Sequence, residues 1–266
     1  MNNLVSRYGN WAFIAGAAEG IGAAFSTALA RQGMYLIMVD KNLLALNALA
    51  DELEQTHRIK TLRIFQDLSE ENAGNSCLDK VKDVNFRLMI YIPAFSPVGR
   101  FTEYQAEDID RFLSLNVRTP VHLLHTFLKS RPEDQRCGVI LMSSLAGMLG
   151  PALAAPYAAT KAFSLVLSES LFYELKEDKV DVLACCAGPT STPTYWSSNP
   201  GKQNKLLGIM QPTEVAEYAL KKLGKRSFCI PGWKNRLFYY FLTRIIPRKT
   251  AGNLVNRSMT KMYTHL

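Results

Sequence analysis

Tyr157 and Lys161 form the pair with the clearest chemistry in this sequence of 266 residues. They lie four residues apart in PYAATKAFSLVLSESL, a helix-like segment with Pro156 in its first turn. That spacing puts both side chains on one helix face, with Cβ atoms about 5–6 Å apart. An ammonium beside a phenol favours the phenolate and lowers a tyrosine pKa that starts at about 10. Tyr157 could then exchange a proton with a ketone or alcohol oxygen. The alternative is a half-buried tyrosine beside a surface lysine.

A second chemical motif is the glycine-rich run AGAAEGIG at residues 15–22, which follows a strand-like segment and opens a helix-like one. Its first glycine permits a tight turn, and the later two permit close approach of the backbone to a pyrophosphate. The N-terminus of the helix supplies N–H groups and a partial positive charge for phosphates. The alternative is a glycine-rich turn that binds nothing. We predict a dinucleotide site with contacts from Gly16, Glu19, Gly20, Ile21 and Gly22.

Acidic residues follow the second and third strand-like segments. Asp40 closes the second, 18 residues after Gly22, where a carboxylate accepts hydrogen bonds from ribose hydroxyls and repels a 2′-phosphate. This position favours NAD(H), although the neighbouring Lys41 could attract a phosphate and leaves NADP(H) open. Asp67 and Leu68 follow the third segment and are placed to meet the adenine. A helix N-cap is an equally good interpretation of Asp67.

The elements that must position these residues alternate regularly between strand and helix. Strand-like runs lie near 11–15, 35–39, 60–66, 87–92, 138–143, 180–186 and 227–230, and helical patterns near 20–32, 42–56, 70–82, 107–130 and 156–178. Alternation at this pitch predicts a single α/β domain, a doubly wound parallel sheet of about seven strands with helices on both faces. Ligands should then bind at the carboxyl ends of the strands.

The sequence resembles the short-chain dehydrogenase/reductase family over essentially its whole length. The glycine run, an asparagine in SLNVRTP, a serine 13 residues before the tyrosine, and the Tyr-Lys pair occur in the family's order. The resemblance implies a Rossmann-type fold and catalysis by Asn116, Ser144, Tyr157 and Lys161. In it, Ser144 hydrogen-bonds the substrate oxygen and Tyr157 is the general acid/base. Lys161 lowers the tyrosine pKa and binds the nicotinamide ribose, and Asn116 holds a water in the proton relay.

The same resemblance extends to the cofactor and the branch of the family. Gly188 and Thr192, in AGPTSTP, match positions of the nicotinamide loop. The opening RYGNWAFIAGAAEGIG and the basic, aromatic C-terminus look like the branch of long-chain 3-ketoacyl reductases and hydroxysteroid dehydrogenases. The family habit implies a homodimer or homotetramer built on the helices near 107–130 and 156–178.

Three departures from the family pattern affect support around the site. Ala15 replaces the threonine before the first glycine, Tyr91-Ile92-Pro93-Ala94 replaces the NNAG segment, and Ala187 replaces the proline before Gly188. They motivate a rival hypothesis, a non-catalytic dinucleotide-binding sensor or scaffold. The intact serine, tyrosine, lysine and asparagine favour the enzyme.

The segment 190–211 is long for a loop in a compact domain, and loops of this length usually have a function or are disordered. Its apolar side chains could close over a substrate, and they are Tyr195, Trp196, Leu206, Leu207 and Met210. We expect Tyr195 and Trp196, with Ser144 and Tyr157, to contact a lipophilic ketone or secondary alcohol. Candidate substrates are a steroid or bile acid, a 3-ketosphingoid compound and a long-chain 3-ketoacyl compound.

The C-terminal part concentrates the positive charge. Eleven of the 31 Lys and Arg residues follow Glu217, whereas none of the 23 Asp and Glu residues do, so a uniformly basic nucleic-acid binder is excluded. We expect residues 1–232 to form the main domain, which includes the substrate loop 190–211, and 233–266 to form a basic, aromatic helical appendage. Three uses of the appendage stay open: contact with an anionic membrane, packing on the domain or a second subunit, and docking of an acidic acyl-carrier protein.

Composition narrows the remaining classes. Apolar residues make up 48% and charged residues 20%, values typical of a globular chain rather than a disordered one. No apolar stretch approaches the roughly 20 residues of a spanning helix, and the first ten residues lack a signal-peptide core. Five cysteines without a CxxC pair indicate reduced thiols and a cytoplasmic protein. His122 and His125 lie three residues apart without an evident third ligand, so we expect no metal site.

Overall fold

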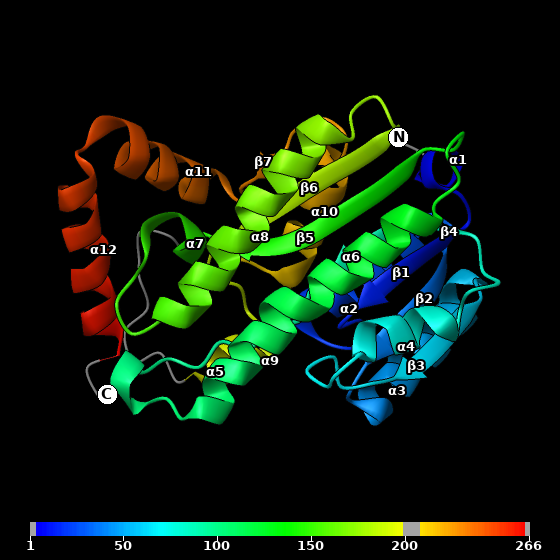
Figure 1. Cartoon of the computed structure of the whole chain (residues 1–266), viewed down its shortest axis with the longest axis horizontal. Coiled ribbons are helices and arrows are strands. Elements are labelled where there is room, and N and C mark those ends of the chain that lie inside the picture. Colours follow the sequence, from blue (N-terminus) through cyan, green and yellow to red (C-terminus); the bar gives the residue numbers. More distant parts are fainter. Residues whose placement is uncertain (1–3, 199–207, 264–266) are drawn as a thin grey trace.

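The computed structural model describes residues 4–198 and 208–263. Within them, seven parallel strands form one sheet in the order β3-β2-β1-β4-β5-β6-β7 (Figure 1). The strands are β1 (Trp11–Ala15), β2 (Tyr35–Asp40), β3 (Thr61–Phe65), β4 (Phe86–Tyr91), β5 (Cys137–Ser144), β6 (Val180–Ala187) and β7 (Phe228–Cys229). Every predicted strand segment lies in this sheet, so the predicted doubly wound α/β fold is confirmed.

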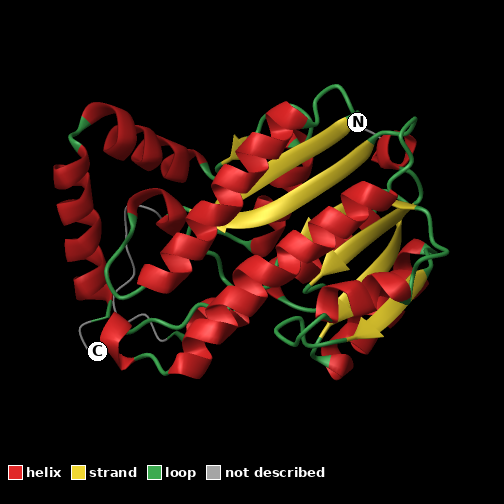
Figure 2. Cartoon of the chain, viewed as in Figure 1, coloured by secondary structure: helices red, strands yellow, loops and turns green. Residues whose placement is uncertain are grey.

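Helices cover the sheet on both faces (Figure 2). In the described residues the α-helices are α1 (Leu4–Tyr8), α2 (Gly20–Ala30), α3 (Leu43–His57), α4 (Ala73–Asp79), α5 (Ala106–Leu113), α6 (Thr119–Ser130), α7 (Ala146–Leu149), α8 (Ala155–Glu174), α9 (Pro193–Ser197), α10 (Pro212–Lys222), α11 (Trp233–Tyr240) and α12 (Arg248–Met262). Short 3₁₀ or π turns are η1 (Phe101–Glu103), η2 (Ser114–Arg118) and η3 (Phe241–Ile245).

Alternating residues of each strand supply the two hydrophobic cores. Along β1, Ala12 and Ile14 face the core formed with α2, α3 and α10, whereas Phe13 and Ala15 face the core formed with α4 and α6. The same alternation runs through β2, β4 and β5. It follows from the two-residue period of a strand whose two faces are both buried.

The predicted helix near 107–130 is interrupted at the middle by the π turn η2. Pro120 lies in the first turn of α6 and has no N–H for the carbonyl of Asn116, four residues earlier. The chain therefore widens to an i→i+5 pattern, in which the N–H of Thr119 donates to the carbonyl of Ser114. π turns inside helices often mark functional positions.

The carboxyl ends of the central strands meet at one edge of the sheet. There β1 leads into the glycine-rich run, β2 ends at Asp40, and β5 ends at Ser144. The chain order reverses between β1 and β4, which makes this edge the expected ligand crevice.

The C-terminal segments extend past the sheet. Figure 1 shows α11 and α12 at the left, beyond the helices that cover the strands. Among the described residues, no helix has the length and apolar character needed to cross a bilayer. The five cysteines are buried and make no disulfide, and the described ranges hold no cluster of three or more potential metal ligands.

Candidate active site

The side chains of Ser144, Tyr157 and Lys161 come together where β5 meets α8. The Ser144 Oγ accepts a hydrogen bond from the N–H of Ala146 at 3.2 Å, which fixes its position. Its hydroxyl also lies near enough to the phenol of Tyr157 to act on the pKa of that phenol. The Nζ of Lys161, one helical turn further on, lies 5.7 Å from the centre of the Tyr157 ring. The structure therefore joins the predicted serine, tyrosine and lysine in one site.

Burial controls the proton affinities of this site. The phenol of Tyr157 is half-buried, and its lost hydration raises its pKa above the ordinary value, although the Ser144 hydroxyl acts to lower it. Lys161 is only 4% exposed, and burial lowers its pKa to about 8. Its Nζ donates to the carbonyl of Met142 at 2.8 Å. The expected lowering of the Tyr157 pKa is therefore wrong for this arrangement, because burial of the phenol outweighs the effect of the Ser144 hydroxyl.

Asn116 is held rigidly in η2. Its Oδ1 accepts from the N–H of Phe95 at 2.7 Å, and its Nδ2 donates to the carbonyl of Phe95 at 2.9 Å and to Thr160 Oγ1 at 3.0 Å. Thr160 lies between the tyrosine and the lysine in α8. The asparagine side chain therefore ties α8 to the loop after β4, and Pro120 leaves the main-chain carbonyl of Asn116 without the N–H that a regular helix would offer it four residues later.

Tyr91 braces this part of the site in place of the missing NNAG amides. It ends β4, is 4% exposed, and donates from its hydroxyl to the carbonyl of Leu115 at 2.6 Å. Burial raises the pKa of this phenol well above its ordinary value, so it remains a donor. This contact anchors the residue before Asn116. No motif marked the contact, but a tyrosine at the end of a buried strand needs a partner for its hydroxyl.

The glycine-rich run forms a tight cradle. A Cβ on Gly22 would lie 1.6 Å from the carbonyl oxygen of Gly16, and one on Gly20 would lie 2.9 Å from Thr192. Gly16 itself has φ +73°, a left-handed conformation that favours glycine. The side chain of Glu19 does not cap α2, so the first N–H groups of this helix remain suited to binding an anion.

The hydroxyl lost at Ala15 is replaced by other contacts. The N–H groups of Gly16 and Ala17 donate to the carbonyl of Val39 at 2.8 and 3.1 Å. From α2, the Ser26 hydroxyl donates to the carbonyl of Ala17 at 3.2 Å. The cradle is therefore tied to β2 and α2 without the threonine.

Asp40 and Leu68 occupy the predicted adenosine side of the crevice. Asp40 accepts from the N–H of Ala18 at 2.9 Å with Oδ2, and from the N–H of Asn42 at 3.0 Å with Oδ1. Besides its predicted role at the ribose, Asp40 thus anchors the glycine cradle, a role that the spacing did not indicate. Leu68 is buried in the core, and its carbonyl accepts from Thr119 at 2.9 Å.

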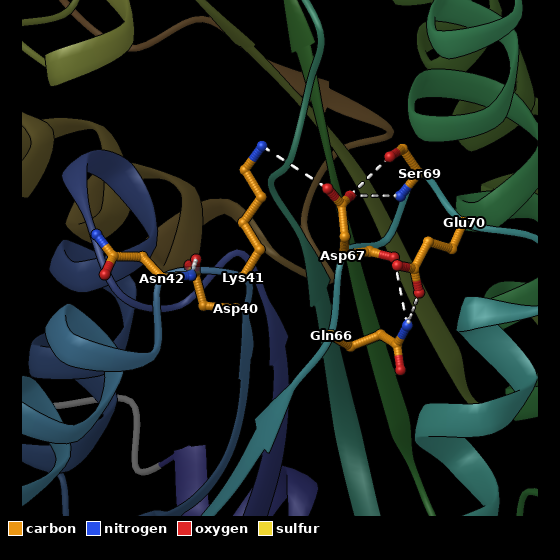
Figure 3. Close-up of polar contacts among 7 residues, drawn as sticks. All are labelled: Asp40, Lys41, Asn42, Gln66, Asp67, Ser69 and Glu70. Atoms are coloured by element: carbon orange, nitrogen blue, oxygen red, sulfur yellow. Dashed lines mark hydrogen bonds and ion pairs between the residues drawn. The ribbon is translucent and has the colours of Figure 1, made fainter.

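Figure 3 shows Lys41 reaching toward Asp67 on the neighbouring strand end, at an Nζ–Oδ2 distance of 3.9 Å. The Oδ1 of Asp67 accepts from the N–H and Oγ of Ser69 at 2.9 and 2.7 Å. Burial raises the pKa of Asp67, but the Ser69 hydrogen bonds and the charges of Lys41 and Arg111 outweigh it and lower the pKa. The N-cap interpretation of Asp67 is wrong, because α4 has Asn72 at that position.

The loop after β6 is supported by a residue that the sequence did not single out. Asn235, at the start of α11, is 1% exposed and donates from Nδ2 to the carbonyl of Pro231 at 3.0 Å and to the sulfur of Met210 at 3.2 Å. A Cβ on Gly188 would lie 2.7 Å from this Nδ2, which explains the glycine. Met210 therefore supports this loop.

Thr192 and the two predicted substrate residues lie together on α9. Thr192 caps this helix by accepting from the N–H of Tyr195 at 3.1 Å. The rings of Tyr195 and Trp196 meet edge to face, with centroids 5.1 Å apart. Leu206 and Leu207, with the rest of 199–207, lie outside the described residues.

Helix α12 lies in the predicted C-terminal appendage and returns to the same side of the molecule. The Oδ1 of Asn256 accepts from the N–H of Ala152, between the catalytic serine and tyrosine, at 2.6 Å. The hydroxyls of Tyr263 and Ser198 lie 3.0 Å apart beside α9. The C-terminus therefore contacts both segments that flank the expected substrate side.

Comparisons with known proteins agree with this geometry. A family model for short chain dehydrogenases matches residues 10–203. The 7beta-hydroxysteroid dehydrogenase of Clostridium sardiniense is 31% identical over 235 residues, which cover 88% of this chain and 90% of that protein. The chain is a short-chain dehydrogenase.

Two further matches place this short-chain dehydrogenase within its family. A very-long-chain 3-oxoacyl-CoA reductase-like protein of Arabidopsis thaliana is 29% identical over 249 residues, 91% of this chain and 79% of that protein. A solved structure from work on 7beta-hydroxysteroid dehydrogenase stereoselectivity has a TM-score of 0.89 and 27% identity, and covers 95% of this chain and 99% of that chain. These relatives match the predicted branch.

Proposed function

We propose that this short-chain dehydrogenase interconverts a lipophilic ketone and its secondary alcohol with a nicotinamide dinucleotide. The observation that carries the proposal is the grouping of Ser144, Tyr157 and Lys161 in one site, together with a glycine cradle of the kind that holds a pyrophosphate. A pure sensor or scaffold has no use for a buried lysine beside a phenol.

In the reductive direction, the hydroxyls of Ser144 and Tyr157 donate hydrogen bonds to the carbonyl oxygen of the substrate. Tyr157 is protonated because burial raises its pKa, and it gives its proton to that oxygen. The cofactor, when bound, supplies hydride in this direction and accepts it in the other. Lys161 stabilises the resulting phenolate, and the Asn116 carbonyl holds a water that returns the proton.

For the cofactor we propose NAD(H). The Asp40 carboxylate lies at the end of β2, and its charge disfavours a 2′-phosphate. The neighbouring cation Lys41 is paired with Asp67, which reduces its attraction for a phosphate. Gly16, Glu19, Gly20, Ile21 and Gly22 would hold the pyrophosphate, Asp67 and Leu68 the adenine side, and Gly188 and Thr192 the nicotinamide side.

For the substrate we propose a steroid or bile acid, with long-chain 3-ketoacyl and 3-ketosphingoid compounds as the other members of the class. The similarity to 7beta-hydroxysteroid dehydrogenases supports the first choice. The aromatic pair Tyr195 and Trp196 offers apolar surface beside the site, and Trp196 is 47% exposed.

The deciding experiment follows nicotinamide absorbance with NADH and NADPH against these three ketone classes. The Tyr157→Phe variant should lose about 10²–10⁴-fold in kcat, the usual contribution of a positioned acid or base. Tyr173→Phe, an exposed tyrosine of the same helix, should keep wild-type activity. Turnover that survives Tyr157→Phe would overturn the catalytic assignment, and cofactor binding without turnover on any substrate would favour the sensor.

We also propose a homodimer or homotetramer built through α5, α6 and α8. Helix α8 exposes Phe163, Val166 and Tyr173 on one side, the kind of apolar surface that subunits cover. Residues 1–232 would form the catalytic domain, with 233–266 as an appendage. Val166→Glu should lower the mass measured by sedimentation, and an unchanged mass would contradict this interface.

A further inference from the structure

Helix α11 and the turn η3 present an apolar face away from the protein. The inward side is fixed by Asn235 and Leu242, which are 1% and 2% exposed. On the opposite side, Trp233, Leu237 and Tyr240 recur at helical spacing and are 65%, 61% and 57% exposed. With Phe241 and Ile245 of η3, which are also exposed, they form what we call the tail face. A helix that only packs on its domain would turn its apolar side inward.

The tail face carries cations at its borders. Lys234 and Arg244 are exposed, and the Nζ of Lys234 lies 5.8 Å from the centre of the Trp233 ring. The sequence has no acidic residue after Glu217 but eleven Lys and Arg residues. An anionic surface complements this charge, whereas a second copy of the same face would bring like charges together.

Tryptophan, tyrosine and leucine with lysine and arginine alongside are the residues that proteins place at the boundary between lipid headgroups and acyl chains. Figures 1 and 2 show α11 and α12 at one end of the molecule, beyond the sheet. We propose that the tail face docks on the surface of an anionic lipid bilayer, with the aromatic side chains at the headgroup boundary.

The test is co-sedimentation of the full chain with vesicles of phosphatidylcholine alone and of phosphatidylcholine mixed with phosphatidylglycerol. Wild type should bind the mixed vesicles and release in high salt. Trp233→Ser should weaken the partition constant about tenfold because it removes apolar area from the boundary. Arg244→Glu should weaken it by more than about fivefold, the effect expected from losing one cation at such a surface.

Two matched substitutions control for general effects of surface changes. Leu44→Ser removes an apolar side chain that is 83% exposed on α3, and Lys176→Glu reverses an exposed charge away from the tail. Both should bind as wild type does. All four variants should keep the wild-type turnover measured without vesicles, because none touches the site.

Three results would overturn the proposal. One is wild-type chain that stays in the supernatant with mixed vesicles. Another is binding by Trp233→Ser and Arg244→Glu equal to that of the controls. The third is a fall in sedimenting mass of Trp233→Ser without vesicles, which would identify the tail face as a subunit interface instead.

Discussion

Removing the hydroxyl of Tyr91 tests whether this chain braces its site in the way the structure indicates. Tyr91→Phe keeps the ring and its packing but deletes the donor to the Leu115 carbonyl, a hydrogen bond of 2.6 Å in a buried setting. A buried acceptor left without its donor costs about 1–3 kcal/mol. Because about 2–4 °C of melting temperature corresponds to each kcal/mol in proteins somewhat smaller than this one, a fall of roughly 2–12 °C is expected.

The same substitution should also reduce turnover, because Leu115 precedes Asn116 in η2. Freed from Tyr91, this turn can shift the Asn116 carbonyl, and displacements well below 1 Å already lower rates. We expect kcat to fall about tenfold, with little change in the cofactor KM. The measurements are thermal unfolding and steady-state kinetics on the ketone that wild type turns over.

Tyr240→Phe is the matched control, since it deletes the same atom from a side chain that is 57% exposed. It should leave both quantities unchanged. If Tyr91→Phe and Tyr240→Phe behave alike in melting temperature and in kcat, the Tyr91–Leu115 contact does not support the site, and the reasoning from burial is refuted.

Three other substitutions test separate parts of the site. Asp40→Ala should shift the preference toward NADPH and raise the KM for NADH, measured as the ratio of kcat/KM values; an unchanged ratio would contradict the cofactor proposal. Asn235→Ala should loosen the loop at Gly188 and therefore raise the cofactor KM more than it lowers kcat. If titration shows that the variant binds cofactor as tightly as wild type, this expectation is contradicted. Burial lowers the pKa of Lys161 to about 8 in the folded chain. Between this pKa and the pKa of the lysine in the unfolded chain, the unfolded chain binds more protons, so the contribution of Lys161 to the unfolding free energy rises with pH. The unfolding free energy of wild type minus that of Lys161→Met should therefore increase across this range in denaturant titrations, and a flat difference would show that the lysine is not buried as described.

The fold was predictable because each element carries its own period. A strand buried on both faces is a short apolar run, and a covering helix repeats its apolar residues at helical spacing, so the order of elements fixed the class. The predicted helix near 107–130 differed, because it was broken at η2 by Pro120. That proline was visible in SLNVRTP, but its effect on Asn116 depends on backbone geometry that a periodicity does not encode.

The parts of the site whose residues lie close together in the sequence were predictable. Tyr157 and Lys161 share a helix face, and Gly16 and Gly22 share a turn, so spacing alone brings each pair together. The contacts of Tyr91 with Leu115 and of Asn256 with Ala152 join residues far apart in sequence. Only the folded chain shows which distant partner a buried hydroxyl or amide finds.

The departures from the family pattern bear on whether lost motif residues mean lost function. Ala15 removes a hydroxyl, yet Ser26 and the Val39 carbonyl hold the same turn. Tyr91 removes an amide, yet its own hydroxyl reaches the turn that carries Asn116. In both places other residues supply the support, while the groups that would exchange protons with substrate are kept. A scaffold released from catalysis would be free to lose those groups first, so the pattern of what is replaced and what is retained favours an enzyme that still turns over.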